Sequence, residues 1–396
     1  MKVVGHPARA LFVAVLITGA FPERALAEQS VRDVLSFLLI NRSVATGDFV
    51  RDEEAATTTR DTISGFLLTE LATLPVSSSA GGFTYRLDPA LGTVTRSSDS
   101  FGPFFTERSL TAGRGQSSFS VSYRHAMFDT IDGRSLRDGT LVSTASTLRG
   151  EFAPFDVETV TLQMRTNTTT FSGNVGLTDR LDVSAAVPLI RLTLRGERVD
   201  TYRGTTFVQA TGSATASGLG DIVVRAKYNL LRRAAGGVSI AGETRLPVGR
   251  DEDLLGAGEI SLTPRVIASH ESERVAVHGD VGYRLSGIAD DLEYNAAVTL
   301  VGSARVTLVG EMVGRRSASL GRLTEVTQPH PSLPGVQTIR LTALPEPTHR
   351  IVAIAGLKWN PAGSWIVSAN ILRPLTNSGL NAGWVPTLTF DYSFAR

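Results

Sequence analysis

The sequence of 396 residues contains no cysteine. This absence excludes disulfide bonds, thiolate metal sites and cysteine nucleophiles. An excess of either charge is also missing, because 39 lysines and arginines are matched by 38 aspartates and glutamates, for a net charge of +1 at pH 7. A chain with so little net charge has no overall field with which to attract nucleic acid. We therefore expect no nucleic-acid partner.

Long apolar runs are scarce. No stretch beyond the N-terminus reaches the roughly 18 consecutive apolar residues that a membrane-spanning helix requires. The N-terminus itself has positive charges at Lys2 and Arg9, a short apolar stretch over residues 10–21, and the cleavage pattern A-L-A at residues 25–27. This order is typical of a secretory signal peptide over residues 1–27. The alternative, an N-terminal membrane anchor, is disfavoured because the apolar stretch is too short to span a bilayer.

Catalytic motifs are missing as well. The sequence contains no G-x-S-x-G, no H-E-x-x-H, no Walker-type phosphate loop and no dinucleotide-binding glycine motif after a strand. The histidines are scattered. The pair His278 and Asp280 offers a metal or proton-relay site or, as we favour, one part of a charged hydrogen-bond network. We therefore expect no enzyme activity, no cofactor and no bound metal.

What the sequence has instead is an alternation of apolar and polar residues from about residue 115 onward. In VGLTDRLDVSAAVPL, residues 175–189, Leu181 and Val183 point to one side, and Asp182 and Ser184 point to the other. A period of two predicts strands with two unlike faces. Near Phe171 the alternation slips by one residue, which predicts a β-bulge. The pattern predicts twelve strands, near residues 115–128, 157–176, 180–195, 219–231, 237–248, 258–269, 274–286, 291–301, 305–315, 349–359, 365–373 and 384–394.

The links between these strands alternate in length, with one exception near 287–290. Short turns at one end, long loops at the other and an even strand count are typical of a bacterial outer-membrane barrel. The sequence therefore predicts an all-β fold, a transmembrane antiparallel up-and-down β-barrel of about 12 strands over residues 115–396. A secreted soluble β-protein is the alternative. The long links are expected near 129–156, 196–218, 249–257, 316–348 and 374–383.

The composition of the apolar face favours lipid over a protein core as its neighbour. Small residues such as Ala185, Gly242 and Gly310 are frequent on it, and lipid adapts to any shape, whereas a protein core must be close-packed. Aromatic residues lie near strand ends, where interfacial girdles belong. The opposite face then lines the barrel lumen, and its charged residues are Arg124, Arg165, Asp182, Arg225, Lys227, Glu243, Arg245, Glu259, Arg265, His278, Asp280, Arg284, Glu293, Glu311, Lys358 and Asp391.

These lumen residues have two interpretations. Balanced charges at this density form a network of ion pairs that fills the barrel, or they line an aqueous pore. We favour a partly filled lumen. The proline-rich segment 314–350 is expected on the extracellular side, where it either folds inward as a constriction or covers the mouth.

Residues 28–114 are expected to form a small helical and irregular segment ahead of the barrel. Apolar residues recur at helical spacing over Val31–Leu39 and again over Ile63–Leu74. Such apolar stripes need a partner, which is the barrel interior, another periplasmic protein or the membrane surface. We favour a plug inside the barrel. In it Val31, Leu35, Leu38 and Leu67 form a small core, and polar faces pair with Arg225, Glu243 and Arg245.

Three stretches resemble a known family. They are NVGLTDRLDVSAAVPLI (174–190), SGLGDIVVRAKYNLL (217–231) and AGETRLPVGRDEDLLGAGE (241–259). They are similar to the outer-membrane transporters grouped as the MetA-pathway of phenol degradation family. The resemblance covers roughly residues 115–394, and it implies an outer-membrane β-barrel that passes small apolar molecules. It implies no binding residues. Outer-membrane proteins commonly end on Phe, whereas here Phe394 is followed by two more residues.

Together these observations predict a protein of the bacterial outer membrane. We expect a passive channel for small, aromatic or otherwise apolar, molecules. The alternative is a non-transporting barrel that serves as an anchor or scaffold, with residues 28–114 as a periplasmic interaction module. The expected partners are outer-membrane lipid, a small-molecule substrate and, during biogenesis, the barrel-assembly machinery.

Overall fold

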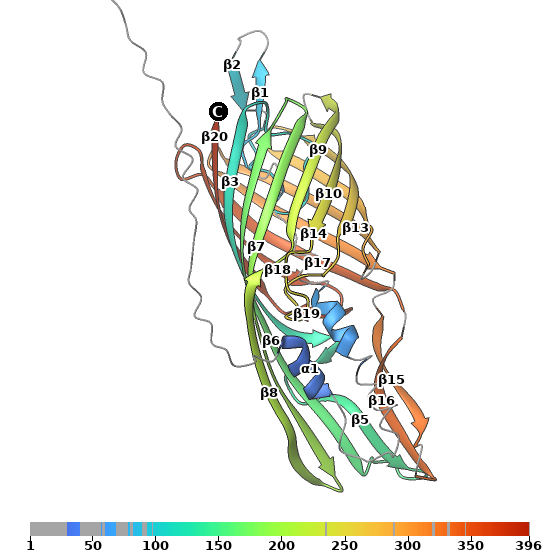
Figure 1. Cartoon of the computed structure of the whole chain (residues 1–396). Helices are drawn as coiled ribbons and strands as arrows, with labels where there is room; N and C mark the ends of the chain where they lie inside the picture. The colour runs from blue at the N-terminus through green and yellow to red at the C-terminus, as the bar shows by residue number, and fades with distance from the viewer. Residues whose placement is uncertain are drawn as a thin grey trace, which may run out of the picture.

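The structure of the protein, a computed structural model, is dominated by one closed antiparallel β-barrel (Figure 1). It describes residues 30–39, 57, 60–68, 78–79, 82–88, 93–96, 98–233, 236–287, 290–318, 321–330, 333–344 and 346–395. The expected signal peptide, residues 1–27, lies outside the described residues. The predicted fold class is confirmed.

Twelve strands close the barrel, and all twelve predicted strands are confirmed. Each pairs antiparallel with its neighbours, and the last pairs with the first. In order around the wall they are β3 (Gln116–Ile131), β6 (Asp156–Gly176), β7 (Leu181–Tyr202), β9 (Ile222–Arg233), β10 (Gly236–Leu246), β11 (Ser261–Glu271), β12 (Val275–Arg284), β13 (Asp291–Ser303), β14 (Val306–Ser317), β17 (Thr348–Trp359), β18 (Trp365–Pro374) and β20 (Val385–Ala395).

Several of the predicted long loops are instead strands that lengthen the wall. β7 continues to Tyr202 and returns as β8 (Thr205–Leu219), along its own outer half. The described residues of segment 314–350 neither fold inward nor cover the mouth, because most of them form the hairpin β15 (Arg322–Pro329) and β16 (Val336–Leu344). β16 pairs with β5 (Leu141–Leu148), which pairs with β6. The short strands β4 (Arg134–Ser135) and β19 (Leu380–Ala382) complete this extension. We call it the long-strand end, and the opposite end the short-turn end (Figure 1).

The slip in alternation near Phe171 is not a bulge, and that prediction is wrong. Even-numbered residues of β6 face inward along the whole strand, and its pairing with β3 and β7 has no register shift there. What changes is the side that is apolar. Toward the long-strand end the inward residues Leu162 and Met164 are buried, whereas toward the short-turn end the outward Phe171 is exposed. The apolar residues of β6 therefore lie on its inward face toward the long-strand end and on its outward face toward the short-turn end. The side on which even-numbered residues lie stays the same.

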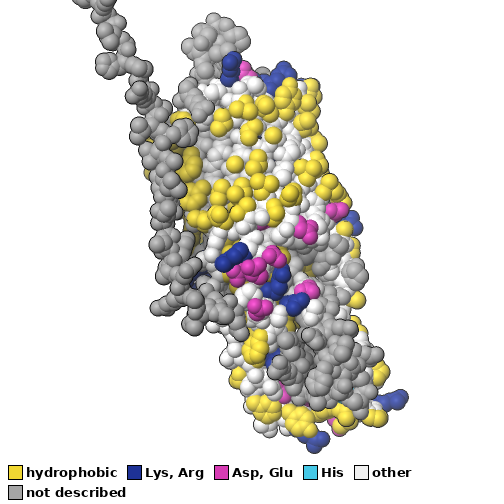
Figure 2. Space-filling model, viewed as in Figure 1, with side chains coloured by type: hydrophobic (Ala, Val, Ile, Leu, Met, Phe, Trp, Pro, Cys, Tyr) yellow, Lys and Arg dark blue, Asp and Glu magenta, His cyan; other side chains and the backbone are white. Residues whose placement is uncertain are grey.

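An apolar belt surrounds the wall near the short-turn end. Figure 2 shows hydrophobic side chains covering this part of the barrel and a patch of mixed charges beyond it. Its exposed residues include Leu189, Val277, Val298 and Leu308. Aromatic residues such as Trp365 and Tyr392, with ring centroids 4.7 Å apart, lie toward the short-turn edge. An apolar belt flanked by aromatic side chains is the outer surface of a membrane barrel.

Helix α1 (Val31–Leu39) lies inside the long-strand end, against β7 and β8 (Figure 1). The predicted helix is confirmed there, and residues 60–68 are helical as well. Gly196 of β7 and Gly212 of β8 are directly opposite each other. A Cβ on Gly196 would overlap Leu38, and one on Gly212 would lie 3.0 Å from Val34. The paired glycines therefore make the flat place on which the helix packs.

The remaining elements are few. The hairpin β1 (Tyr85–Asp88) and β2 (Thr93–Arg96) lies at the short-turn end (Figure 1). Among the residues that the structure describes, no helix is long and apolar enough to cross a membrane.

Candidate functional site

Residues 98–112 run through the barrel lumen, and we call them the lumen strap. Their backbone is held by side chains of the inner wall. Lys358 donates to the carbonyl oxygen of Pro103 (2.7 Å), and Asn229 donates to that of Ser109 (2.7 Å). Asp182 accepts from the backbone N–H of Ala112 (2.9 Å). The strap has no secondary structure of its own, so the wall supplies the partners that its backbone groups need.

Glu311 of β14 makes the densest of these contacts. Its carboxylate accepts hydrogen bonds from the backbone N–H groups of Phe104, Phe105 (3.1 Å) and Thr106 (2.9 Å) and from the Thr106 hydroxyl (3.0 Å). Glu311 is buried. A buried carboxylate is stable when its oxygens are fully hydrogen-bonded. Glu311 therefore fixes the strap where two aromatic side chains project.

The side chain of Glu107 anchors the strap from its own side. It forms ion pairs with Arg225 and, at 3.4 Å, with Lys227. Ser79 donates to it from its backbone nitrogen (2.8 Å) and its hydroxyl (2.9 Å). Burial by itself would raise the pKa of Glu107, but the charges of Arg225 and Lys227 and the hydrogen bonds from Ser79 hold that pKa below its ordinary value.

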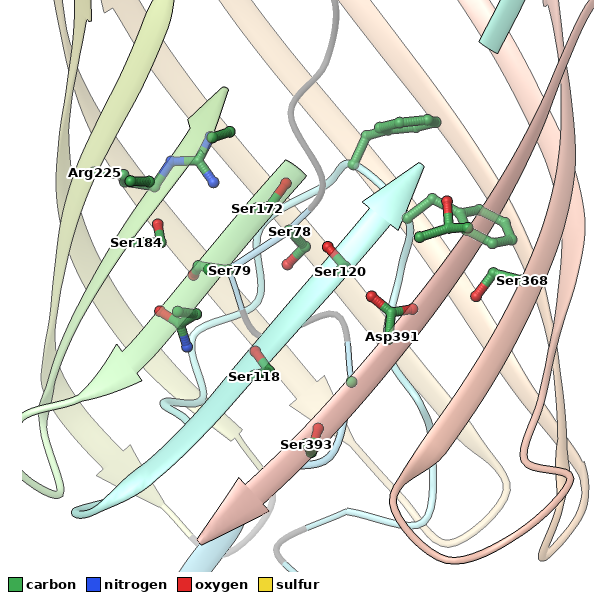
Figure 3. Close-up of a pocket in the computed structure, with 18 of the residues that line it drawn as sticks. Ser78, Ser79, Ser118, Ser120, Ser172, Ser184, Arg225, Ser368, Asp391 and Ser393 are labelled. Atoms are coloured by element: carbon green, nitrogen blue, oxygen red, sulfur yellow. The ribbon is translucent and has the colours of Figure 1, made fainter. Parts of the chain in front are cut away.

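The predicted lumen residues separate into two groups by position. One group holds the strap: Asp182, Arg225, Lys227, Asp280, Glu311 and Lys358. The other lies toward the long-strand end and forms ion pairs or a cation–π contact: Arg124, Glu243, Arg245, Arg265, Arg284 and Glu293. His278 is buried, and its Nδ1 lies 3.0 Å from the Ser269 hydroxyl. Asp391 lies on the inner wall at the short-turn end (Figure 3).

Two predicted lumen residues lie elsewhere. Arg165 is on the outward side of β6 and exposed, because the apolar phase of that strand changes sides between its two halves. Glu259 is exposed in the connection between β10 and β11, so it is not on a strand face. The alternation of apolar outward and polar inward residues does not hold at either position.

A cavity of about 110 Å³ lies between the strap and the long-strand end. We call it the arginine chamber. Beyond the second group above, it is lined by Arg315 and Arg350. Both lie within predicted strands, 305–315 and 349–359, but they are not among the predicted lumen residues. Its other lining residues are largely apolar, among them Phe128, Ile354 and Leu372.

A second cavity, of about 50 Å³, lies toward the short-turn end. Figure 3 shows Ser118, Ser120, Ser172, Ser184, Ser368 and Ser393 along the surrounding strands. We call it the serine chamber. These small residues leave space between the strap and the wall of β3, β6, β7, β18 and β20. Phe105 and Arg225 line both chambers, so the two cavities meet at the strap.

The lumen strap itself was not predicted. The polar faces of the predicted helices over Val31–Leu39 and Ile63–Leu74 were expected to pair with Arg225, whereas the ion pairs of Arg225 are with Glu107 of the strap and Glu243 of the wall. An irregular segment has no apolar period that would reveal its position. The one available signal is local: the run FGPFFTERSL, residues 101–110, combines aromatic residues with an adjacent acid and base in a stretch that is otherwise rich in small polar residues.

Comparisons with solved structures return β-barrels of low sequence identity. An outer membrane channel from Pseudomonas putida F1 is 14% identical, with 72% of this chain and 97% of that one covered at a TM-score of 0.48. The KdgM porin is 10% identical (69% and 99% covered, TM-score 0.35). A FadL homologue from Pseudomonas aeruginosa is also 10% identical (81% and 98% covered, TM-score 0.32).

Comparisons with sequences give one result. No curated protein matches this chain. The profile of the family described as "Putative MetA-pathway of phenol degradation" matches residues 142–311, from β5 to β14. The motifs at 174–190, 217–231 and 241–259 lie within this range. The family resemblance inferred from the sequence is therefore confirmed, and residues 142–311 of this barrel match the MetA-pathway of phenol degradation family.

Proposed function

We propose that the protein is an outer-membrane channel through which small molecules diffuse passively, with the lumen strap as its constriction. The apolar belt supports a location in a bilayer. Short turns on the periplasmic side and longer connections outside are the usual orientation of such barrels. The long-strand end and the arginine chamber are then extracellular, and the serine chamber is periplasmic.

The observation that carries the proposal is the shared lining of the two chambers. Phe105 and Arg225 border both cavities, so these two side chains lie where the two spaces meet. Its aromatic part projects from the strap and its charged part from the wall strand β9. A constriction of one aromatic and one cation is the kind of filter that sets size and polarity limits in a pore.

Planar-bilayer recordings of residues 28–396 test the proposal, with Phe105→Ser as the test variant. Serine removes the ring but leaves the backbone N–H that Glu311 accepts. We expect discrete channels whose conductance rises at least about twofold in the variant, since the narrowest point of a pore dominates its resistance. Phe207→Ser is the matched control, because Phe207 is exposed on β8 and lines neither chamber.

A scaffold that transports nothing is the second candidate. The many contacts that hold the strap favour it, because a firmly filled lumen passes little. Channels absent from the native protein and from both variants, while heat-modifiable gel mobility shows folded barrels, would support the scaffold and contradict the channel.

A further inference from the structure

We propose that the outer surface of β6 and β7 binds the phosphate groups of lipid A, the phosphorylated glycolipid of the outer leaflet, through Arg165, Arg191 and Arg195. We call these three residues the arginine triangle. The inference goes beyond the proposed function, because it concerns the outside of the wall and does not depend on transport. It takes only the orientation of the barrel from that proposal.

The arginine triangle lies where the apolar belt ends. The outward residues of β7 are apolar from Leu181 to Leu189, and the next outward residue is the exposed Arg191. On β6 the exposed Phe171 shares the outward face with Arg165 and lies closer to the short-turn end. Two residues of a strand span roughly 6.8 Å. Hydrocarbon and guanidinium groups are therefore adjacent on this surface.

The strand register brings the three arginines within reach of one another. Arg165 is directly opposite Thr193, and Arg191 and Arg195 lie two residues before and two residues after Thr193. Each is therefore a diagonal neighbour of Arg165, at a separation of roughly 7–8 Å that long side chains can bridge. One phosphate group can then accept hydrogen bonds from Arg165 and from either of the other two arginines.

The protein does not neutralise these charges. Among the described residues, none forms an ion pair or a hydrogen bond with the side chain of any of the three arginines. Glu197 follows Arg195 on the outward face of β7, so three arginines and one glutamate leave two positive charges. Like charges on neighbouring strands are destabilising. An anion bound between the arginines offsets that repulsion.

The neighbouring strands place no carboxylate opposite the triangle. The register partners of this part of β6 and β7 are Ser213, Thr215 and Ser217 on β8 and His125 and Met127 on β3. Arg250, in the connection between β10 and β11, donates to the carbonyl oxygen of Ser217 (3.5 Å), but it is paired with Asp253 (2.7 Å). The positive charge of the surface therefore comes from the triangle.

Tyr123 of β3 indicates the depth of the triangle in the membrane. Its hydroxyl donates to Oδ1 of Asn167 (2.8 Å), and Asn167 is the register partner of Arg191. The Tyr123 ring is exposed on the outer surface. A tyrosine with an apolar ring and a polar tip is typical of the membrane–water interface. The arginine triangle therefore lies at the level of the lipid headgroups.

Other outward arginines at this edge of the belt are arranged differently. Arg373 of β18 lies over the Trp384 ring, 4.6 Å from its centroid. Arg316 of β14 is exposed, and its register partners are Leu292 and His349. A single arginine attracts an anionic headgroup, but it cannot share a phosphate with a second guanidinium group. The triangle is therefore the place where a phosphate would be held in one geometry.

Lipid A matches both parts of this surface. Its phosphates are anionic, and its acyl chains continue from them into hydrocarbon, as the surface does from Arg191 to Leu189. Leu189 and its register partner Leu219 are both exposed. Free phosphate would bind the arginines but leave these leucines uncovered. Phosphatidylcholine has a cation next to its phosphate, which the arginines repel.

Native mass spectrometry of the refolded, detergent-solubilised protein tests the inference, because it counts bound lipid molecules. Lipid A is titrated in parallel with dephosphorylated lipid A and with phosphatidylcholine. We expect both of these lipids to bind at least about tenfold more weakly than lipid A, as expected for the loss of charge-assisted hydrogen bonds. Inorganic phosphate at the same concentration as lipid A should displace little of it, because it has no acyl chains.

The variants Arg165→Gln and Arg191→Gln test the triangle. We expect each to weaken the binding of lipid A about fivefold, the effect typical of one arginine at an anionic surface. Arg316→Gln is the matched control, because Arg316 is an exposed outward arginine at the same edge of the belt but outside the triangle. It should change the affinity by less than about twofold.

Equal binding of lipid A and its dephosphorylated form would overturn the inference, and so would displacement by an equal amount of inorganic phosphate. A loss in Arg316→Gln as large as that in Arg191→Gln would also overturn it, because the attraction would then be diffuse. The lipid series on the native protein decides the matter even where a variant fails to fold. The measurement is independent of conduction, so it tests the lipid site separately from the channel.

Discussion

Some charged residues of the lumen wall bind the strap, and others form ion pairs within the wall. The sequence did not predict which residue does which. Alternation predicted that Glu311 and Glu243 share the inner face, because the period of a strand fixes the side on which a residue lies. Alternation could not predict the hydrogen-bond or ion-pair partner of either side chain. Glu311 holds three backbone N–H groups of the strap, and Glu243 pairs with Arg225 and Arg245. The partners of Glu311 belong to the strap. The strap is irregular, and an irregular segment has no periodic apolar pattern from which its position could be predicted.

The substitution Glu311→Gln should release the strap. The amide places donors where backbone N–H groups point, so hydrogen bonds to a charged acceptor are lost at a cost of about 3 kcal/mol. We expect the amides of residues 98–112 to exchange with deuterium roughly a hundredfold faster. Hydrogen-exchange mass spectrometry measures this. Glu259→Gln, at an exposed position in the connection between β10 and β11, should leave exchange in the strap unchanged.

At the scale of elements, the sequence predicted the strands of the barrel well and its extension poorly. Within the apolar belt, each wall strand has an apolar environment on its outer face and a polar one on its inner face, so the alternation there is regular. Strands β5, β8, β15 and β16 lie beyond the apolar belt, and β8 in particular is rich in threonine, alanine and glycine. Without lipid on the outer side, their pattern resembles that of a loop. Helix α1 was predictable because its apolar stripe is complete.

The docking of α1 should depend on the glycine pair beneath it. Gly212→Val places a branched side chain against Val34, and overpacking of this kind costs about 1–3 kcal/mol. We expect faster tryptic cleavage at Arg32, which lies within the helix. Gly310→Val is the matched control, because an added Cβ there meets nothing within 4 Å. Equal cleavage rates in the two variants would show that the helix does not need the glycine.

For the whole molecule, the apolar belt determines which part of the barrel lies within the bilayer. Val298 is exposed on β13 within the belt, whereas Thr211 is exposed on β8 at the long-strand end. The same substitution at the two positions therefore separates contact with lipid from contact with water.

Val298→Arg should destabilise the barrel in phospholipid vesicles by about 2–4 kcal/mol, the cost of arginine near the middle of a bilayer. Thr211→Arg should change stability by less than about 0.5 kcal/mol, as surface substitutions do. Urea titration followed by heat-modifiable gel mobility gives both values. A loss of similar size in both variants would contradict the assignment of the belt to lipid.

The path of the strap has a consequence for biogenesis. Helix α1 lies at one end of the barrel and hairpin β1–β2 at the other, and the strap then crosses the lumen before β3 begins. The chain is threaded through a ring that its own first and last strands, β3 and β20, complete. We expect this seam to seal last, because the lumen strap can then take its place before the sheet closes around it. Contacts of the strap with Glu311 of β14 and Arg225 of β9 would then bring opposite parts of the open sheet together before it closes.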